Sequence, residues 1–192
     1  FQIGFGGIPG RPVGDGPDGH SLWPAFTNVP NEYIESYFPL RIVDYSSIAD
    51  SGGPGLHRGG NGVSVAYEFL EPGEISIHDD RWLTYPWGVN GGLPGERSSK
   101  LLRRVDGSQA WLPAKCDRVK VSAGDTLHFN TWGGGGWGDP LKRSPRLVAR
   151  DVDCGLVTRE GARRYGVVIR EDSSVDAEAT EVLRRAMADA RP

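Results

Sequence analysis

The chain has 192 residues, of which 38% are hydrophobic and 24% are charged, and its formal net charge is −3. This length is sufficient for one domain with a real core, and the weak negative charge excludes electrostatic recruitment to nucleic acid or to an acidic membrane. No run approaches the roughly 18 apolar residues of a membrane span. The two cysteines, Cys116 and Cys154, lie far apart without a CxxC motif, which favours a reduced protein of the cytoplasm.

Residues 1–39 are predicted to form a polar arm that is rich in glycine and proline. The chain begins without Met, so we expect a fragment or a processed piece of a longer protein. Near the end of the arm, Tyr33, Ile34 and Tyr37 recur at helical spacing, and Pro39 cannot continue a helix. A short helix is therefore expected there.

Alternating apolar and polar residues predict several antiparallel strands after the arm. The first comprises residues 40–45. Residues 63–70 and 74–80 alternate in the same way, and the sequence EPG between them is typical of a hairpin turn. We therefore expect these two segments to pair with each other.

A second hairpin is predicted in the stretch RVKVSAGDTLHFNTW. Val119 and Val121 before the turn, and Leu127 and Phe129 after it, occupy alternate positions. This pattern on both arms indicates an antiparallel sheet with one buried face. His128 lies between two apolar residues and is therefore expected to face solvent.

The pattern then changes from strand to helix. Ser144 is a suitable N-cap, Pro145 suits the first helical position, and Gly155 is a natural stop. Thr158 is expected to cap a second short helix, and residues 167–169 are expected to form a brief strand.

The last segment, residues 176–190, is predicted to be an amphipathic helix. One stripe of its surface is apolar and consists of Ala179, Val182, Leu183, Ala186, Met187 and Ala190. We expect this stripe to be a packing surface rather than a cofactor site.

Together these elements predict a mainly β fold with helices, of the α+β class. The expected parts are the arm at 1–39, an antiparallel sandwich-like or barrel-like β body at 40–140, and a short helical tail at 141–192.

A run of four glycines stands between two tryptophans in TWGGGGWGDP, residues 131–140. It contains the dinucleotide-binding spacing G-x-G-x-x-G, but such a site also needs an immediate helix, and a phosphate loop needs Gly-Lys-Ser/Thr; neither follows. We therefore interpret the run as structural glycines that permit positive φ or close backbone approach. They are Gly133, Gly134, Gly135 and Gly136.

Polar residues of the arm are candidates for a site, because loops held by a rigid sheet often carry function. His20 and Glu32 are the catalytic candidates, and Asp18 and Asn28 are candidates for substrate binding. Arg58, in a second glycine-rich loop, is a candidate anion contact. The alternatives are that the arm is a surface or interface segment and that this loop is a simple turn.

The sequence HDDRW offers a weaker metal candidate. His78 and Asp80 could share one face of a strand, but two ligands are too few for a metal site. An ion pair of Asp79 or Asp80 with Arg81 is the expected alternative, so no metal site is predicted in this chain.

Four stretches of the chain carry a family resemblance. They are DGHSLWPAFTNVPNEYIESYFPLRI, DSGGPGLHRGGNG, LPAKCDRVKVSAGDTLHFNTWGGGGWGDP and RDVDCGLVTREGARRYGVVI. Over about residues 4–170 the sequence resembles the C-terminal part of B-type subunits of the hydantoinase B/oxoprolinase family. The glycine run followed by Asp-Pro, a short helix and YGVV is the most specific part.

This resemblance implies a part of an ATP-dependent cyclic-amide hydrolase complex of the hydantoinase or 5-oxoprolinase type. A partner A-type subunit with an actin-like ATPase fold would bind ATP and activate the substrate by phosphorylation. The B-type subunit would then carry the hydrolytic step, usually with a divalent metal. The family's metal motif belongs to the N-terminal half of these B-type subunits and has no match here. We therefore expect the metal on an N-terminal B-type chain or segment or on another subunit, and the isolated chain to be inactive.

The resemblance leaves two other functions open. The first is a subunit of a biotin-independent, ATP-dependent ketone carboxylase of the acetone or acetophenone type, in which SLWPAF at residues 21–26 could line a pocket for an aromatic ketone. The second is a non-catalytic assembly subunit, which the missing metal motif and the amphipathic terminal helix favour.

Overall fold

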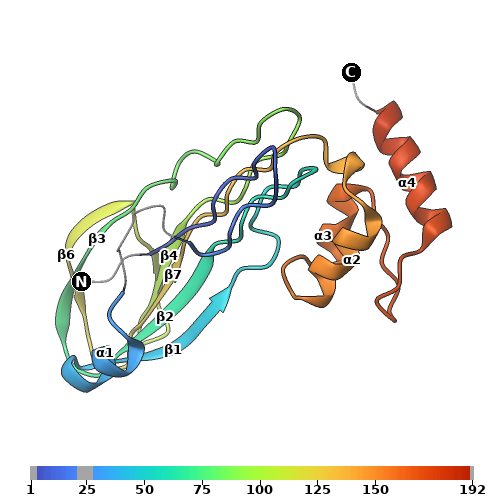
Figure 1. Cartoon of the computed structure of the whole chain (residues 1–192). Coiled ribbons are helices and arrows are strands. Elements are labelled where there is room, and N and C mark those ends of the chain that lie inside the picture. Colours follow the sequence, from blue (N-terminus) through green and yellow to red (C-terminus); the bar gives the residue numbers. More distant parts are fainter. Residues whose placement is uncertain (1–3, 21–27, 191–192) are drawn as a thin grey trace.

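The structure of the protein is a computed structural model that describes residues 4–20 and 28–190 (Figure 1). A five-stranded antiparallel sheet has the order β1-β2-β7-β4-β5, and β3 and β6 form a separate two-stranded sheet. The strands are β1 (Leu40–Ser47), β2 (Val63–Phe69), β3 (Gly73–His78), β4 (Ser99–Arg103), β5 (Gln109–Trp111), β6 (Lys115–Val121) and β7 (Thr126–Asn130). Helices follow after the last strand, so the expected α+β fold is confirmed in its open, sandwich-like form.

The two sheets enclose one hydrophobic core. The large sheet contributes Phe69, Leu102 and Leu127, and the small sheet contributes Ile77 and Val121. Each fully buried side chain of this size stabilises the fold by about 1.5–3 kcal/mol. The alternating pattern of the strands therefore fixes the small sheet over the large one.

The two predicted hairpins are wrong, although their strands exist. β2 pairs with β1 and β7, whereas β3 pairs with β6. β6 and β7 are likewise in different sheets. At each turn the chain crosses from one sheet to the other, and the Gly124 N–H donates to the Phe69 carbonyl where the two crossings meet (2.8 Å). Alternation identifies the buried face of a strand but does not identify its neighbour, so strands that face each other across a core resemble a hairpin.

His128 is less exposed than its alternation suggests. β7 is an inner strand that pairs with both β2 and β4, and the side chain of His128 is half-buried. Burial lowers the pKa of this imidazole, and the nearby charge of Arg103 lowers it further.

The short helix of the arm is confirmed as α1 (Asn31–Tyr37). It begins after Pro30, buries Ile34, and packs against β1. Figure 1 places α1 at the end of the β body that is remote from the helical tail.

Between the β body and the tail, four glycine-rich segments run side by side as extended chains (Figure 1). Main-chain hydrogen bonds join them: the Gly7 N–H donates to the Trp132 carbonyl, the Gly60 N–H to the Ile8 carbonyl, and the Gly134 N–H to the Gly60 carbonyl, each at 2.8 Å. A Cβ on Gly134 would overlap the Ile8 carbonyl. We call this region the glycine bundle; it comprises residues 4–19, 51–62, 86–95 and 132–138.

The helical tail begins at Pro140 and contains its own small core. Its elements are η1 (Pro140–Lys142), α2 (Pro145–Asp153), α3 (Arg159–Ala162), η2 (Arg163–Tyr165) and α4 (Ala177–Asp189). Thr158 caps α3 by accepting from the Gly161 N–H (2.9 Å), and Gly155 and Gly166 have positive φ after helices. The core consists of Val148, Val157, Ala162, Tyr165, Val167 and Ile169.

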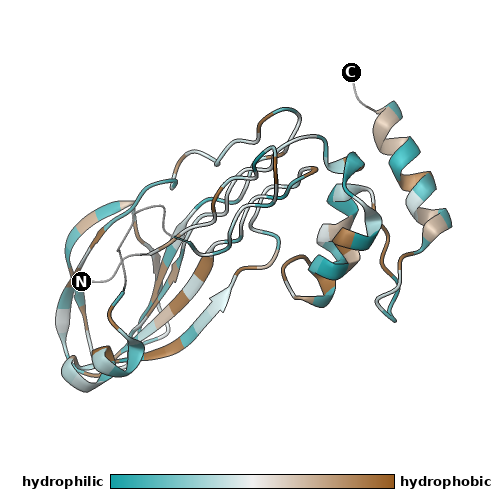
Figure 2. Ribbon diagram, in the orientation of Figure 1, coloured by the Kyte–Doolittle hydropathy of each residue, from teal (hydrophilic) through white to brown (hydrophobic). Residues whose placement is uncertain are grey.

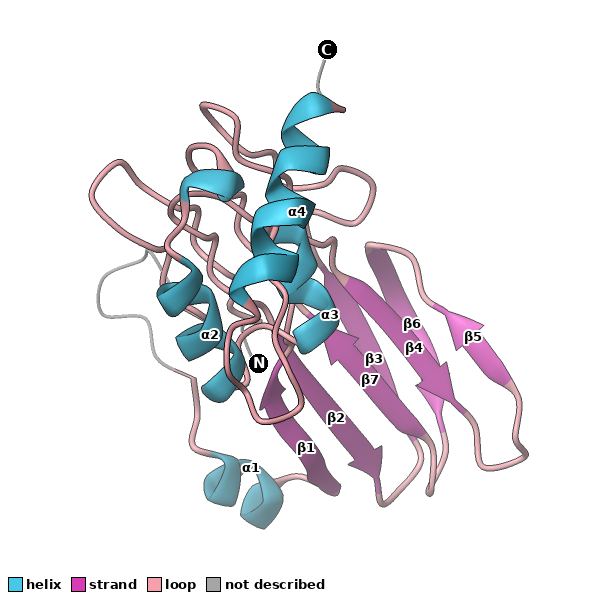
Figure 3. Ribbon diagram, turned by 90° about the vertical axis from the view of Figure 1, so that its right-hand side faces the viewer, coloured by secondary structure: helices cyan, strands magenta, loops and turns pink. Residues whose placement is uncertain are grey.

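Two expectations for the tail are corrected. Residues 167–169 are not a strand, because Ile169 makes only an isolated bridge with Val175 while Val167 fills the core. In α4, whose first turn Asp176 caps through the Ala179 N–H (3.0 Å), the predicted apolar stripe is not buried; Thr180 is the buried residue. Figure 2 shows mixed hydropathy around this helix, and Figure 3 shows α4 running outward to the C-terminus.

Candidate functional site

Five charged residues form a buried network where the glycine bundle meets the helical tail. Asp15 and Asp18 come from the arm, Arg58 comes from the second glycine-rich loop, and Arg143 and Asp151 come from the tail. The network therefore joins three segments that lie far apart in the chain.

Arg143 is the centre of this network and is 1% exposed. Its two terminal nitrogens each lie 2.7 Å from one oxygen of Asp15, and its Nη2 also donates to Asp151 (2.8 Å). Burial alone would lower the pKa of Arg143, but the hydrogen bond to Asp15 and the charge of Asp151 raise it above its ordinary value. Arg143 therefore stays charged and fully hydrogen-bonded inside the protein.

Arg58 makes the second bidentate pair. Its terminal nitrogens lie 2.7 and 3.0 Å from the two oxygens of Asp18, and its Nε lies 3.8 Å from Asp151. The main chain completes the arrangement, because the Arg58 N–H donates to Asp15 (2.8 Å) and the Asn61 N–H donates to Asp18 (2.7 Å). An anionic substrate at Arg58 would have to compete with Asp18 for the guanidinium.

The carboxylates of the network differ in their electrostatics. Burial opposes the ionisation of Asp15, but the hydrogen bond and charge of Arg143 hold its pKa below the ordinary value. Burial dominates at Asp151 and raises its pKa in spite of the same arginine. Three carboxylates share two guanidinium groups here, so Asp151 is the member of the network that most readily accepts a proton.

The structure places the sequence-predicted site residues in two separate regions. It brings Asp18 and Arg58 together in the buried network, and His20, close by in sequence, has an exposed side chain while its N–H donates to the Gly6 carbonyl (3.0 Å). Asn28 is half-buried just before α1, and Glu32 is exposed in the first turn of α1. Residues 21–26, the predicted aromatic lining, lie outside the described residues.

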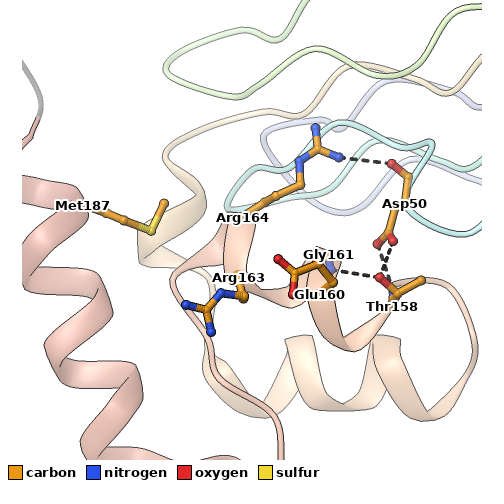
Figure 4. A pocket seen from close by; sticks show the side chains of 7 residues that line it. All are labelled: Asp50, Thr158, Glu160, Gly161, Arg163, Arg164 and Met187. Atoms are coloured by element: carbon orange, nitrogen blue, oxygen red, sulfur yellow. Dashed lines mark hydrogen bonds between the residues drawn. The ribbon is translucent and has the colours of Figure 1, made fainter.

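An open groove separates α3 from α4 (Figure 4). Its volume is about 510 Å³, and its lining residues are Asp50, Thr158, Glu160, Gly161, Arg163, Arg164 and Met187. The carboxylate of Asp50 accepts from the Thr158 N–H (2.9 Å) and hydroxyl, and Arg164 donates to the Asp50 carbonyl (3.2 Å). Sequence reasoning missed this groove because Asp50 and Thr158 are 108 positions apart.

A buried ion pair crosses the β sandwich. Lys100 of β4 pairs with Asp79, which follows β3, and its amine lies 5.0 Å from the ring centre of Phe129. Burial lowers the pKa of Lys100 to about 8. The expected pairing of Asp79 with Arg81 is therefore wrong, and Arg81 instead stacks on Trp87 (5.1 Å).

Possible metal ligands are dispersed. His78 lies 3.1 Å from Asp117 and not beside Asp80 as considered above. In the part of the chain that the structure describes, no three His, Cys, Asp or Glu side chains are grouped to hold a metal ion. Cys116 and Cys154 are free thiols, and no helix within the described ranges is long and apolar enough to cross a membrane.

Comparisons with known proteins place this geometry among a set of enzyme subunits. The family model described as Hydantoinase B/oxoprolinase matches residues 1–140. The B-type subunit of a D-/L-hydantoinase from Pseudomonas sp. (strain NS671) is 34% identical over 96% of this chain and 32% of its own length. The acetophenone carboxylase delta subunit of Aromatoleum aromaticum is 30% identical over 100% of this chain and 33% of its own length.

A solved structure shows the same arrangement of elements. The crystal structure of the ATP-dependent caprolactamase from Pseudomonas jessenii superimposes with a TM-score of 0.80 and 29% identity, and the match covers 94% of this chain and 32% of that chain. The chain thus spans about a third of the length of the relatives that it matches.

Proposed function

The chain belongs to the hydantoinase B/oxoprolinase family, and from this premise we propose that it is the C-terminal portion, or a separately encoded part, of the B-type subunit of an ATP-dependent cyclic-amide hydrolase. The observation that carries the proposal is the match of 94% of the chain to the structure of an ATP-dependent caprolactamase. The alignment with a B-type hydantoinase subunit over almost the whole chain supports the same class of substrate.

The proposed division of labour assigns ATP to a partner A-type subunit. This subunit would phosphorylate the cyclic amide and so make its carbonyl carbon a better electrophile. A divalent metal, held by the remaining B-type segment or by another subunit, would then assist the attack of water. The isolated chain would be inactive because it contains neither of these parts.

Within this chain, His20 and Glu32 are the proposed proton-transfer groups, and Asp18, Asn28 and Arg58 are the proposed substrate contacts. The buried network supports a role for the arm, because the pair of Arg58 with Asp18 holds the main chain two residues before His20. An imidazole that is exposed on an ordered arm can approach a site formed by another segment. His20 and Glu32 lie in different regions, so they would act on the substrate through separate contacts.

The test is to reconstitute the chain with the remaining B-type polypeptide and the A-type subunit encoded with it. Release of ring-opened product from hydantoin, 5-oxoproline or caprolactam would be followed together with ATP hydrolysis. Loss of a general acid or base typically costs about 10²–10⁴-fold in rate. The variants His20→Ala and Glu32→Ala should show such losses, with Glu35→Ala as the control for Glu32→Ala on the same helix. Unchanged turnover in both variants would refute the two assignments.

A carboxylase is the second candidate function. The acetophenone carboxylase delta subunit aligns with the entire chain, so the same reconstituted complex should be supplied with bicarbonate and with acetone or acetophenone. ATP-dependent formation of a carboxylated ketone without ring opening would favour this function over the hydrolase. A complex that assembles fully but turns over none of these substrates would favour an assembly role.

A further inference from the structure

An exposed apolar surface runs along the loop that joins β3 to β4. Its six members are Leu83, Tyr85, Trp87, Val89, Leu93 and Trp111, the last from the edge strand β5. Leu83 is 82% exposed, and Trp87 and Trp111 are 67% and 66% exposed. We call these six residues the aromatic ridge. Monomeric proteins normally expose apolar side chains singly, and a connected group of them marks an interaction site.

Contacts within the loop connect the ridge. Tyr85 and Trp111 line one hollow of about 330 Å³ together with Trp82. Arg97 lies 4.5 Å from the ring centre of Tyr85 and donates to the Leu83 carbonyl (3.2 Å). The exposed rings therefore have preferred positions before any partner binds, which reduces the entropy that binding must overcome.

The main chain behind the ridge is part of the glycine bundle. The Val89 N–H donates to the Gly136 carbonyl (2.9 Å), and the Gly136 N–H donates to the Leu93 carbonyl (2.9 Å). A Cβ on Gly135 would overlap the carbonyl of Trp87. The ridge thus stands on a hydrogen-bonded main chain, while its side chains stay exposed within the described ranges.

We propose that the aromatic ridge is the surface on which the rest of the B-type polypeptide packs, that is, the roughly two-thirds of the relatives' length that this chain does not contain. This inference rests on the proposed function. The chain covers only 28% of the beta subunit of the caprolactamase and 33% of the acetophenone carboxylase delta subunit, so in such proteins a much longer polypeptide accompanies the equivalent domain. Tryptophan, tyrosine and arginine are the residues enriched at the buried centres of interfaces.

The charges beside the ridge specify the chemistry of the covering surface. Arg81 and Arg97 each stack a guanidinium on a ridge ring, at Trp87 and Tyr85. A covering surface that is apolar at its centre, with carboxylates at the edge toward these two arginines, would complement both features. A second copy of the chain, placed symmetrically on the ridge, would instead bring its own arginines to the same interface.

The experiment produces the chain and the remaining B-type polypeptide of the same complex as two separately tagged proteins. Their dissociation constant is measured by sedimentation velocity. The double variant Leu83→Lys/Trp111→Lys should weaken association by about thirtyfold or more, as for the loss of a hot spot. The matched control Val13→Lys/Val105→Lys alters side chains that are 86% and 71% exposed away from the ridge, and its association should stay within about twofold of the parent.

Thermal unfolding of each isolated variant checks that it is folded, and Leu83→Ser alone provides a milder test if the double variant is not. Association of a folded ridge variant at the parent affinity would overturn the proposal. So would a homodimer of the chain alone that Leu83→Lys disperses. An assembly that depends on the ridge but lacks ATP-dependent turnover would support this surface and contradict the proposed function. Turnover by a complex that ignores the ridge variants would contradict only the surface.

Discussion

In the β sandwich, buried side chains such as Leu102 and Leu127 meet between two sheets, whereas in the glycine bundle the main chains themselves are in contact. The sandwich is stabilised by apolar area removed from water, which tolerates a change of shape when volume is kept. The bundle is stabilised by main-chain hydrogen bonds between chains that approach too closely for a Cβ at positions such as Gly134. The buried charge network then joins the bundle to the helical tail. We therefore expect the two regions to respond differently to substitution.

The largest effect is expected for Gly134→Val. Its side chain would overlap the Ile8 carbonyl, and a main-chain neighbour cannot move aside without breaking the bundle. The loss of stability should exceed about 4 kcal/mol and so leave the chain unfolded or aggregated. Denaturant unfolding followed by circular dichroism measures it. In the control Gly14→Val no heavy atom lies within 4 Å of the new Cβ, so the loss should be far smaller; equal stability of the two variants would contradict the distinction.

The next largest effect is expected for Arg143→Met, which removes the cation between Asp15 and Asp151. Two buried carboxylates would lose their partner, and breaking a buried pair in this way costs about 3–5 kcal/mol. Arg185→Met is the matched control, because Arg185 pairs with Glu181 on the exposed surface of α4 and such a pair contributes about 0.3–0.5 kcal/mol. Urea midpoints that fall equally in both variants would show that the network does not hold the tail to the bundle.

An intermediate, pH-dependent effect is expected for Asp125→Asn at the turn before β7. Burial alone would raise the pKa of Asp125, but hydrogen bonds from the Ser122 N–H, Arg104 and the Val105 N–H hold it below its ordinary value. A lowered folded-state pKa stabilises the protein above the unfolded value of about 3.9, and this contribution is lost as pH falls through the folded-state pKa. The variant should lose about 1–3 kcal/mol at pH 7, and the difference should narrow in acid. A difference that is independent of pH would contradict the role of this carboxylate.

The smallest effect is expected in the sandwich, for Leu102→Met. Volume is nearly conserved at this fully buried position, so the cost should stay below about 1.5 kcal/mol. Gly134→Ala adds only one methyl group in the bundle and should nevertheless cost more. Calorimetric midpoints of the two variants compare the regions directly, and the reverse order would refute the contrast between them.

Residue patterns alone predicted most of the elements of the fold. Alternation located β2, β3, β6 and β7, and capping residues such as Thr158 and Asp176 marked the starts of helices. These features are local, because the period of side chains and the capping of the first turn involve neighbours in the chain. The glycine run was also interpreted as a main-chain device without knowledge of its contacts. The resemblance to a family came from the same local stretches.

Only the tertiary structure decided which elements became neighbours. The hairpin patterns of β2 with β3 and of β6 with β7 describe strands in opposite sheets, because alternation is the same for a partner beside a strand and for one across the core. The union of Asp15, Arg58 and Arg143 and the pair of Lys100 with Asp79 join distant positions that have no fixed spacing. The sequence by itself thus determined the local elements and the family, while the buried charges, the groove beside α4 and the exposed ridge depend on long-range packing.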